Sequence, residues 1–304
     1  MKIGQCVCAG ILSAFLISAA SPDAGRTPVE MIVTVRPSPK GGTPTLEPGD
    51  LTVLANNSPA AVTRLRRLAG DGAAMQLFIL LDDSTRSASL SLHFSELRPF
   101  LNSLPATTEV AVGYMQNGTF REAQAFTADH QKAAAALRLP EAVPGANGSP
   151  YFALSDLVNH WPSKEATGRR AVLMLTDGVD RYYGPAIEDD PYVDAACQDA
   201  LKHGVMVYSI YLRGAGRYGR GSWSTNIAQS RLIQTGEETG GNAYFEDLAD
   251  PVTIAPFLTD LEQRFDNQYE VTIDAPNHRG VAPVKLRTET PGLKISGPSY
   301  VYVP

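Results

Sequence analysis

Residues 77–84 read LFILLDDS, a continuous apolar run that ends on two aspartates and a serine. A second run, AVLMLTDG at residues 171–178, ends in a similar acidic, hydroxyl-bearing turn. Short apolar runs bounded by turn residues are typical of buried parallel strands. The carboxyl ends of parallel strands meet at one edge of a sheet, where open α/β sheets bind ligands. The sequence therefore predicts a ligand site at this edge.

The segment around these runs alternates strands with helices from Met75 onward, a pattern typical of βαβ units. Short strands separated by Pro and Gly turns flank it on both sides. Because the ends of an α/β domain lie close together, these strands are expected to join in one small β subdomain. The predicted fold class is a doubly wound, mostly parallel α/β sheet with that small β subdomain. Its predicted parts are N-terminal β strands at 27–68, an α/β domain at 73–267 and C-terminal β strands at 268–304.

Three local predictions concern segments near the expected edge. Asn117-Gly118 between two strands predicts a hairpin, because both residues tolerate the positive φ of its turn. Thr127 is predicted to cap a helix that runs through Leu139. A long loop rich in Gly, Arg and aromatic residues is expected over 213–225, before a helix over 229–239.

The first twenty residues have the features of a secretory signal peptide: Lys2, an apolar stretch, and small residues before Ser21. The apolar stretch is short for a membrane span, which needs roughly 20 residues; an uncleaved anchor is the alternative. Cleavage would leave Cys197 as the last cysteine of the chain. We therefore expect an exported bacterial protein, periplasmic or extracellular, with no membrane span after cleavage.

Composition and motifs exclude several classes of function. An acidic pI near 5.4 argues against nucleic-acid binding, whose electrostatic footprint is basic. The sequence contains no GxxxxGK[ST] phosphate loop, no GxSxG elbow and no HExxH motif. Its five histidines fall on separate segments without metal-ligand spacing. The prediction is that the protein is not an enzyme.

The two acidic turns resemble those of a von Willebrand factor A (VWA) domain, and more narrowly of the secreted bacterial VWFA-related proteins. That family's metal-ion-dependent adhesion site takes ligands from a DxSxS motif, a threonine in a second loop and the aspartate of a TDG turn. Here Asp82-x-Ser84 and the TDG at 176–178 match, and Ser149 lies where the threonine loop would be. The resemblance implies Mg²⁺ or Mn²⁺ held by Asp82, Ser84, Ser149 and Asp177.

The first motif departs from the family at its third position, where Arg86 stands in place of serine. A guanidinium there can pair with both carboxylates and replace the ion. A second register, Asp83-x-Thr85-x-Ser87, satisfies the hydroxyl spacing, but we favour Asp82 because the family places its aspartate directly after the apolar run. A third interpretation is that these carboxylates merely cap the helices that follow.

Two loops, 179–185 and 213–225, follow strands and should flank the site. They are rich in Tyr, Trp and Arg, the residue types that concentrate in protein interfaces. The alternative is that such an aromatic residue packs inward and closes its own loop. The predicted partner-binding residues are Arg86, Tyr182, Arg217, Tyr218 and Trp223.

The expected function is that of an exported, non-enzymatic protein-binding module, an adhesion or scaffold domain. It would recognise an acidic side chain of a protein partner through the cation at this site. The alternative is a metal-free structural module of the cell envelope, in which Arg86 neutralises a vestigial cation site.

Overall fold

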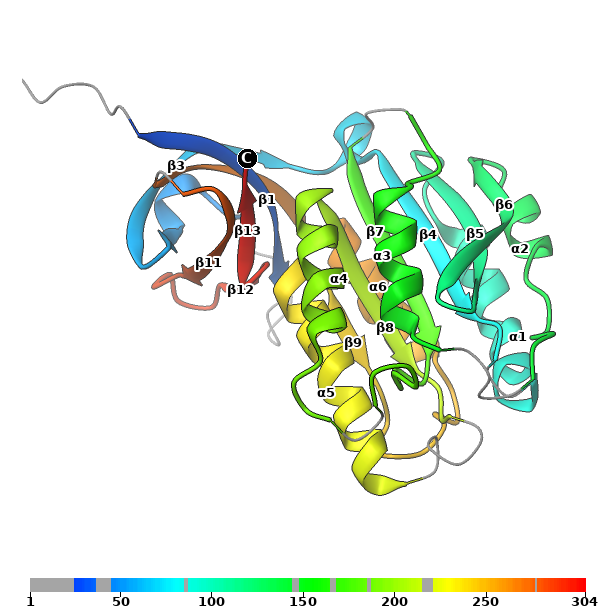
Figure 1. Cartoon of the computed structure of the whole chain (residues 1–304). Coiled ribbons are helices and arrows are strands. Elements are labelled where there is room, and N and C mark those ends of the chain that lie inside the picture. Colours follow the sequence, from blue (N-terminus) through cyan, green and yellow to red (C-terminus); the bar gives the residue numbers. More distant parts are fainter. Residues whose placement is uncertain are drawn as a thin grey trace, which may run out of the picture.

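The computed structural model describes residues 25–36, 45–84, 87–143, 148–164, 168–184, 187–214, 221–276 and 278–304. The predicted signal peptide lies outside these ranges, as do Arg86, Arg217 and Tyr218. The described part of the chain forms two sheets that lie side by side, one of six strands with helices around it and one of seven strands (Figure 1).

The six-stranded sheet is mixed, in the order β6-β5-β4-β7-β8-β9. All its pairs are parallel except that of β5 with β6. Because β5 and β7 lie on opposite sides of β4, the strand order reverses at β4, and ligands bind at such a reversal in open α/β sheets. Its strands are β4 (Met75–Asp82), β5 (Thr108–Gln116), β6 (Thr119–Thr127), β7 (Arg169–Thr176), β8 (Val205–Tyr211) and β9 (Asn242–Tyr244).

Strand β4 is apolar throughout because both of its faces are buried. Leu77 and Ile79 pack in one hydrophobic cluster with α1 and α6, whereas Phe78 and Leu80 pack in another with α3 and α4. Helix α5 packs against β8 and β9. The helices are α1 (Ser87–Ser103), α2 (His130–Ala135), α3 (Pro150–Asn159), α4 (Pro191–Lys202), α5 (Ser222–Thr239) and α6 (Ala255–Asp266).

The seven-stranded sheet is antiparallel, in the order β12-β1-β10-β3-β2-β11-β13, and it curls (Figure 1). It has a hydrophobic core of its own, in which Val33, Val271 and Val301 are buried. One 3-10 helix, η1 (Pro48–Asp50), lies between β1 and β2, and a second, η2 (Gly70–Ala73), leads from β3 to β4 of the mixed sheet. Its strands are β1 (Arg26–Arg36), β2 (Thr52–Ala55), β3 (Ser58–Arg67), β10 (Gln268–Pro276), β11 (Gly280–Arg287), β12 (Lys294–Ser296) and β13 (Tyr300–Val303).

The predicted fold class, a doubly wound and mostly parallel α/β sheet with a small β subdomain, is wrong for this chain. The antiparallel sheet has more strands than the mixed sheet and encloses its own core, so it is a principal part of the fold. The prediction underestimated it because its strands pair over more than 200 residues of sequence, as in Arg26 with Pro276. A local alternating pattern indicates a strand but not the number of its partners.

Of the three local predictions, the hairpin at Asn117-Gly118 is confirmed. Gln116 pairs with Thr119, and the two turn residues have φ of 52° and 78°. The predicted cap of the next helix is wrong, because Thr127 ends β6 and the Asp129 side chain caps α2.

The predicted loop at 213–225 is also too long, since α5 already begins at Ser222 and carries Trp223 on its first turn. The Oγ of Ser224 donates to the carbonyl of Gly221 and so ties this first turn together.

The two sheets are joined where α6 runs directly into β10. The guanidinium of Arg169 on β7 donates to the carbonyls of Phe265 and Ala73 at 2.7 and 2.8 Å, and to Oε1 of Gln268 at 2.7 Å. One buried side chain thus connects the mixed sheet to the end of α6, the start of β10 and η2. In the part of the chain that the structure describes, no helix is long and apolar enough to cross a membrane.

Candidate functional site

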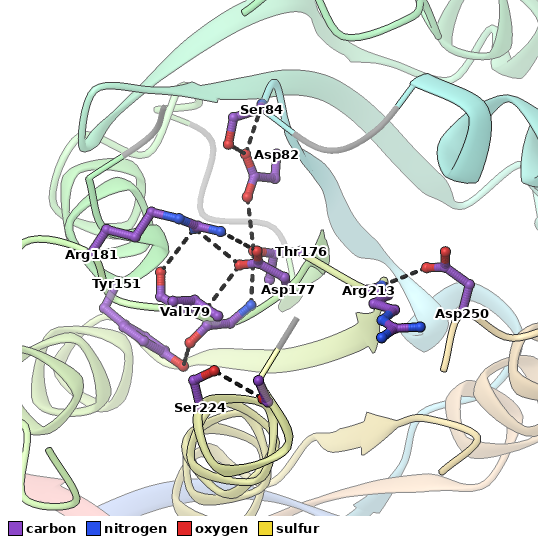
Figure 2. Close-up of polar contacts among 12 residues, drawn as sticks. Asp82, Ser84, Tyr151, Thr176, Asp177, Val179, Arg181, Arg213, Ser224 and Asp250 are labelled. Atoms are coloured by element: carbon purple, nitrogen blue, oxygen red, sulfur yellow. Dashed lines mark hydrogen bonds and ion pairs between the residues drawn. The ribbon is translucent and has the colours of Figure 1, made fainter. Parts of the chain in front are cut away.

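The ends of β4 and β7 are joined by a direct hydrogen bond. Asp82, the last residue of β4, accepts at Oδ2 from the hydroxyl of Thr176, the last residue of β7, at 3.2 Å (Figure 2). Its other oxygen accepts from the backbone nitrogen and the hydroxyl of Ser84, at 2.9 and 2.8 Å. The two acidic turns named from the sequence therefore share one buried edge, which we call the rim: Asp82, Ser84, Thr176, Asp177 and Arg181.

The turn after β7 is held from both sides. Gly178 has a φ of 65°, and a Cβ there would lie 2.8 Å from Leu232 and 3.0 Å from the carbonyl of Ala228 on α5, so only glycine fits. The hydroxyl of the fully buried Tyr151 donates to the carbonyl of Gly178 at 3.0 Å. These contacts fix the position of the aspartate that precedes this glycine.

Asp177 forms a two-point ion pair with Arg181. Nη2 of Arg181 lies 2.5 Å from Oδ2 and Nη1 lies 3.3 Å from Oδ1, while the backbone nitrogen of Val179 donates to Oδ1 at 2.9 Å (Figure 2). The side chains of Asp177 and Arg181 are 7% and 11% exposed. Burial raises the pKa of Asp177, the charge of Arg181 opposes that rise and the charge of Asp82 adds to it.

Ser149 belongs to a neighbouring hydrogen-bond group. Its hydroxyl donates to Oδ2 of Asp180 at 2.7 Å and caps α3 by accepting from the backbone nitrogens of Tyr151 and Phe152. Oδ1 of Asp180 accepts from the backbone nitrogens of Tyr182 and Tyr183, at 2.8 and 2.9 Å. Ser149 therefore helps to hold the loop after β7, and its hydroxyl is directed at the carboxylate of Asp180.

Asp83 faces a different set of donors from Asp82. It accepts from Nη1 of Arg138 and Nε2 of Gln116, both at 2.7 Å, and from the backbone nitrogen of Glu141 at 3.1 Å. The second register of the first motif would need Asp83 at the rim, whereas this carboxylate is engaged elsewhere. Thr85 and the side chain of Ser87 lie outside the described residues.

These contacts do not fit the predicted Mg²⁺ or Mn²⁺ site. A hard cation requires several oxygens directed at one point. Here Asp177 faces a guanidinium, the hydroxyl of Ser84 donates to Asp82, and Ser149 donates to Asp180. Within the described ranges, no three His, Cys, Asp or Glu side chains group as metal ligands would. We therefore derive no role for a bound metal.

The predicted partner-binding residues that the structure describes are both exposed, Tyr182 by 68% and Trp223 by 59%. Tyr182 packs in a group of aromatic rings with Phe152 and Tyr192, at centroid distances of 5.1 and 5.8 Å, and Tyr183 joins it through Tyr192 at 5.6 Å. Arg86, Arg217 and Tyr218 lie outside the described residues.

Sequence reasoning missed two features of this site. It singled out the loop after β7 but did not assign Arg181 to the carboxylates, because a spacing of four residues predicts a pair only on a helix and residues 177–181 are not helical. It also missed the aromatic neighbours of Tyr182, because Phe152 and Tyr192 start separate helices and meet only in the fold.

No family model matches this chain, and no curated protein matches it in sequence. Among solved structures it is similar to an aerotolerance-related membrane protein from Bacteroides fragilis, with 12% identity and a TM-score of 0.44 over 64% of this chain and 99% of that one. The hypothetical protein BatB from Bacteroides thetaiotaomicron gives 14% identity and a TM-score of 0.44, over 63% of this chain and 97% of that one. Human COPII-coat protein Sec24c gives 8% identity and a TM-score of 0.43, over 76% of this chain and 43% of that one. Likenesses this distant assign no family and no function.

Proposed function

We propose that this chain is an exported, non-enzymatic protein-binding module of the VWA type, which contacts its partner through apolar and aromatic side chains around the rim. The observation that carries the proposal is where the large exposed hydrophobic residues lie. Among the described residues they belong to the mixed sheet and its connections, and none belongs to the antiparallel sheet: Leu92, Leu139, Val143, Tyr182, Tyr183, Ile187, Trp223 and Val252.

Several of these residues are tied to the carboxyl ends of the central strands. Tyr182 and Tyr183 directly follow Arg181 of the rim. Val143 directly follows Ala142, whose backbone nitrogen donates to the carbonyl of Asp83 at the end of β4. Val252 lies two residues after Asp250, which accepts from the backbone nitrogen of Arg213 just beyond β8. Exposed apolar side chains beside one edge of a sheet favour a protein contact there, because apolar surface patches commonly mark interaction sites.

The aromatic part of this surface is held in place before any partner arrives. Asp180 accepts from the backbone nitrogens of both exposed tyrosines, and the rings of Phe152 and Tyr192 support Tyr182. A rigid tyrosine contributes a large contact area at a low cost in conformational entropy. The loop after β7 therefore has the properties of a preformed binding surface.

The assignment to the VWA type is supported by the position of the two motifs. DxS at the end of β4 and TDG at the end of β7 lie on adjacent parallel strands, at the reversal of strand order. The sequence resemblance relates the same two turns to the adhesion site of that family. A partner contact at this edge agrees with the position of the two motifs in the sheet and with their resemblance to that adhesion site.

The test is retention of partner proteins on the immobilised mature chain, using extracts of the cells that carry its gene. We expect Tyr182→Ser and Trp223→Ser each to reduce retention of the captured proteins at least tenfold relative to the native chain. Arg64→Ala on β3 is the control, because its side chain is 58% exposed but lies on the other sheet. Equal retention by the native chain and both aromatic variants would contradict the proposal and favour the alternative of a structural envelope module.

A further inference from the structure

The rim contains a positive charge supplied by the chain itself. We propose that the guanidinium of Arg181 takes the place of a divalent cation at this rim, so that the native site is filled by a side chain and does not respond to metal. This inference concerns the charge balance of the rim and stands whether or not the aromatic surface binds a partner.

The contacts of Arg181 are those that a cation would make with the TDG aspartate. Its two terminal nitrogens reach both oxygens of Asp177, and Nη1 also donates to the carbonyl of Val179 at 3.3 Å. A planar fork matched to a carboxylate is the strongest side-chain substitute for an ion, because guanidinium stays charged at all ordinary pH values.

The surrounding charges also require a cation at this point. Asp177, Asp82 and Asp180 are all buried, and each of them acts electrostatically on Arg181. Burial alone would lower the pKa of Arg181, but these three carboxylates hold it above its ordinary value. Buried carboxylates without a positive partner would repel one another in this poorly solvated place.

The backbone holds Arg181 in the position that this role needs. Its own nitrogen donates to the carbonyl of Gly148 at 2.7 Å, and the nitrogen of Tyr182 donates to the same carbonyl at 3.1 Å. The backbone from which the guanidinium extends toward Asp177 is therefore fixed by the fold, and only the side chain of Arg181 loses freedom on pairing.

The decisive variant is Arg181→Met, which removes the charge and keeps an unbranched, though shorter, side chain. At neutral pH we expect its melting temperature to fall by roughly 5 to 10 °C, because the rim carboxylates lose their partner. Addition of Mg²⁺ or Mn²⁺ should restore several degrees, with a gain that grows with the logarithm of the ion concentration above its Kd, since the ion binds only the folded form. The melting temperature of the native chain should be the same in excess Mg²⁺ and in chelator.

Two further variants separate charge from packing. Arg181→Met combined with Asp177→Asn should regain most of the lost melting temperature without metal, and should not respond to metal. Arg138→Met is the matched control, because it strips an arginine from the buried Asp83 outside the rim. It should lower the melting temperature without any recovery in Mg²⁺ or Mn²⁺.

Three results would overturn the inference. The first is saturable Mg²⁺ or Mn²⁺ binding by the native chain in calorimetry. The second is an Arg181→Met variant as stable as the native chain, or a destabilised one that metal does not restore. The third concerns the case in which Arg181→Met does not fold. If the double variant with Asp177→Asn also fails to fold, Arg181 acts through packing and the inference is wrong. If the double variant folds, the result supports the inference.

Discussion

Asp82 and Asp83 are adjacent in the chain, yet their carboxylates meet entirely different surroundings. Asp82 contacts hydroxyl groups of the two acidic turns at the rim. Asp83 is paired with Arg138, whose guanidinium lies over the ring of Tyr114, 3.9 Å from its centroid. The second aspartate thus ties the end of β4 to the segment after α2, which is a structural role rather than a binding role.

The Asp83 pair supports a prediction about stability and its dependence on pH. Arg138→Met should lower the free energy of unfolding by about 2 to 3 kcal/mol at pH 7, because it leaves a buried carboxylate with fewer donors. Burial would raise the pKa of Asp83, but hydrogen bonds from Arg138, Gln116 and the backbone of Glu141 outweigh it and hold that pKa below its ordinary value.

A carboxyl group with a lowered pKa stabilises the fold above the pKa of the unfolded chain, about 3.9, and loses that contribution as the pH falls through the folded value. The difference between native and Arg138→Met chains in urea unfolding should therefore shrink below about pH 4. Lys132→Met is the control, because Lys132 pairs with Asp129 on the surface and should change stability by less than about 0.5 kcal/mol. A difference that stayed constant down to acid pH would show that the pair is not its source.

At this scale the sequence identified the two acidic turns but not the direction of their side chains. Strand β4 is buried on both faces, so its pattern carries no information on which aspartate turns toward β7. The partner of Asp177 escaped notice because the path of Arg181 depends on the carbonyl of Gly148, which is remote in sequence. Motifs encode residue types and spacing, whereas these orientations arise from tertiary contacts.

At the scale of elements, local turn chemistry was informative and long-range pairing was not. Asn117-Gly118 makes its hairpin because both residues accept a positive φ. The same kind of reasoning placed the start of α5 too late, because the Gly and Arg content of the preceding loop masks the helical residues from Ser222 onward. The size of the antiparallel sheet was missed because its pairs depend on residues more than 200 positions apart.

Arg169 connects several elements through one buried side chain. Burial lowers its pKa to about 10, so it remains a cation at neutral pH, held by two backbone carbonyls and Oε1 of Gln268. Its Nε has no hydrogen-bond partner among the described residues. Burying this charge therefore costs some electrostatic free energy, and the hydrogen bonds of the side chain join β7, α6, β10 and η2.

We expect Arg169→Met to lower the free energy of unfolding by about 2 to 4 kcal/mol, because two buried acceptors and one partly buried acceptor lose their donor. Arg169→Lys should recover only part of this loss, since an ammonium group cannot reach three acceptors with the same fork geometry. Arg170→Met is the neighbouring control: its guanidinium lies 5.7 Å from the centre of the Trp161 ring, and its loss should cost about 1 kcal/mol or less. Equal effects of the two methionine variants in urea unfolding would contradict a special role for Arg169.

At the scale of the whole molecule, backbone hydrogen bonds also connect the two sheets. The nitrogen of Ser299, before β13, donates to the carbonyl of Glu237 on α5 at 3.0 Å. The nitrogen of Val35 on β1 donates to the carbonyl of Asn267, between α6 and β10, at 2.9 Å. Because the first bond ties the antiparallel sheet to α5 and the second fixes β1 at the junction of α6 with β10, the two sheets should unfold as one cooperative unit.

This cooperativity can be measured because the two sheets carry different probes. Both tryptophans, Trp161 and Trp223, belong to the mixed sheet and its helices, so their fluorescence follows that part. Hydrogen exchange at the buried β10 residues Val271 and Ile273 follows the antiparallel sheet. In urea the two probes should have the same midpoint in the native chain, which is the expected behaviour of a single transition.

In Arg169→Met we expect β10 to exchange at lower urea than the fluorescence midpoint, because a buried connection between the sheets is then lost. Separate midpoints already in the native chain would show that each sheet is stable by itself, and the buried arginine would then stabilise only its immediate surroundings.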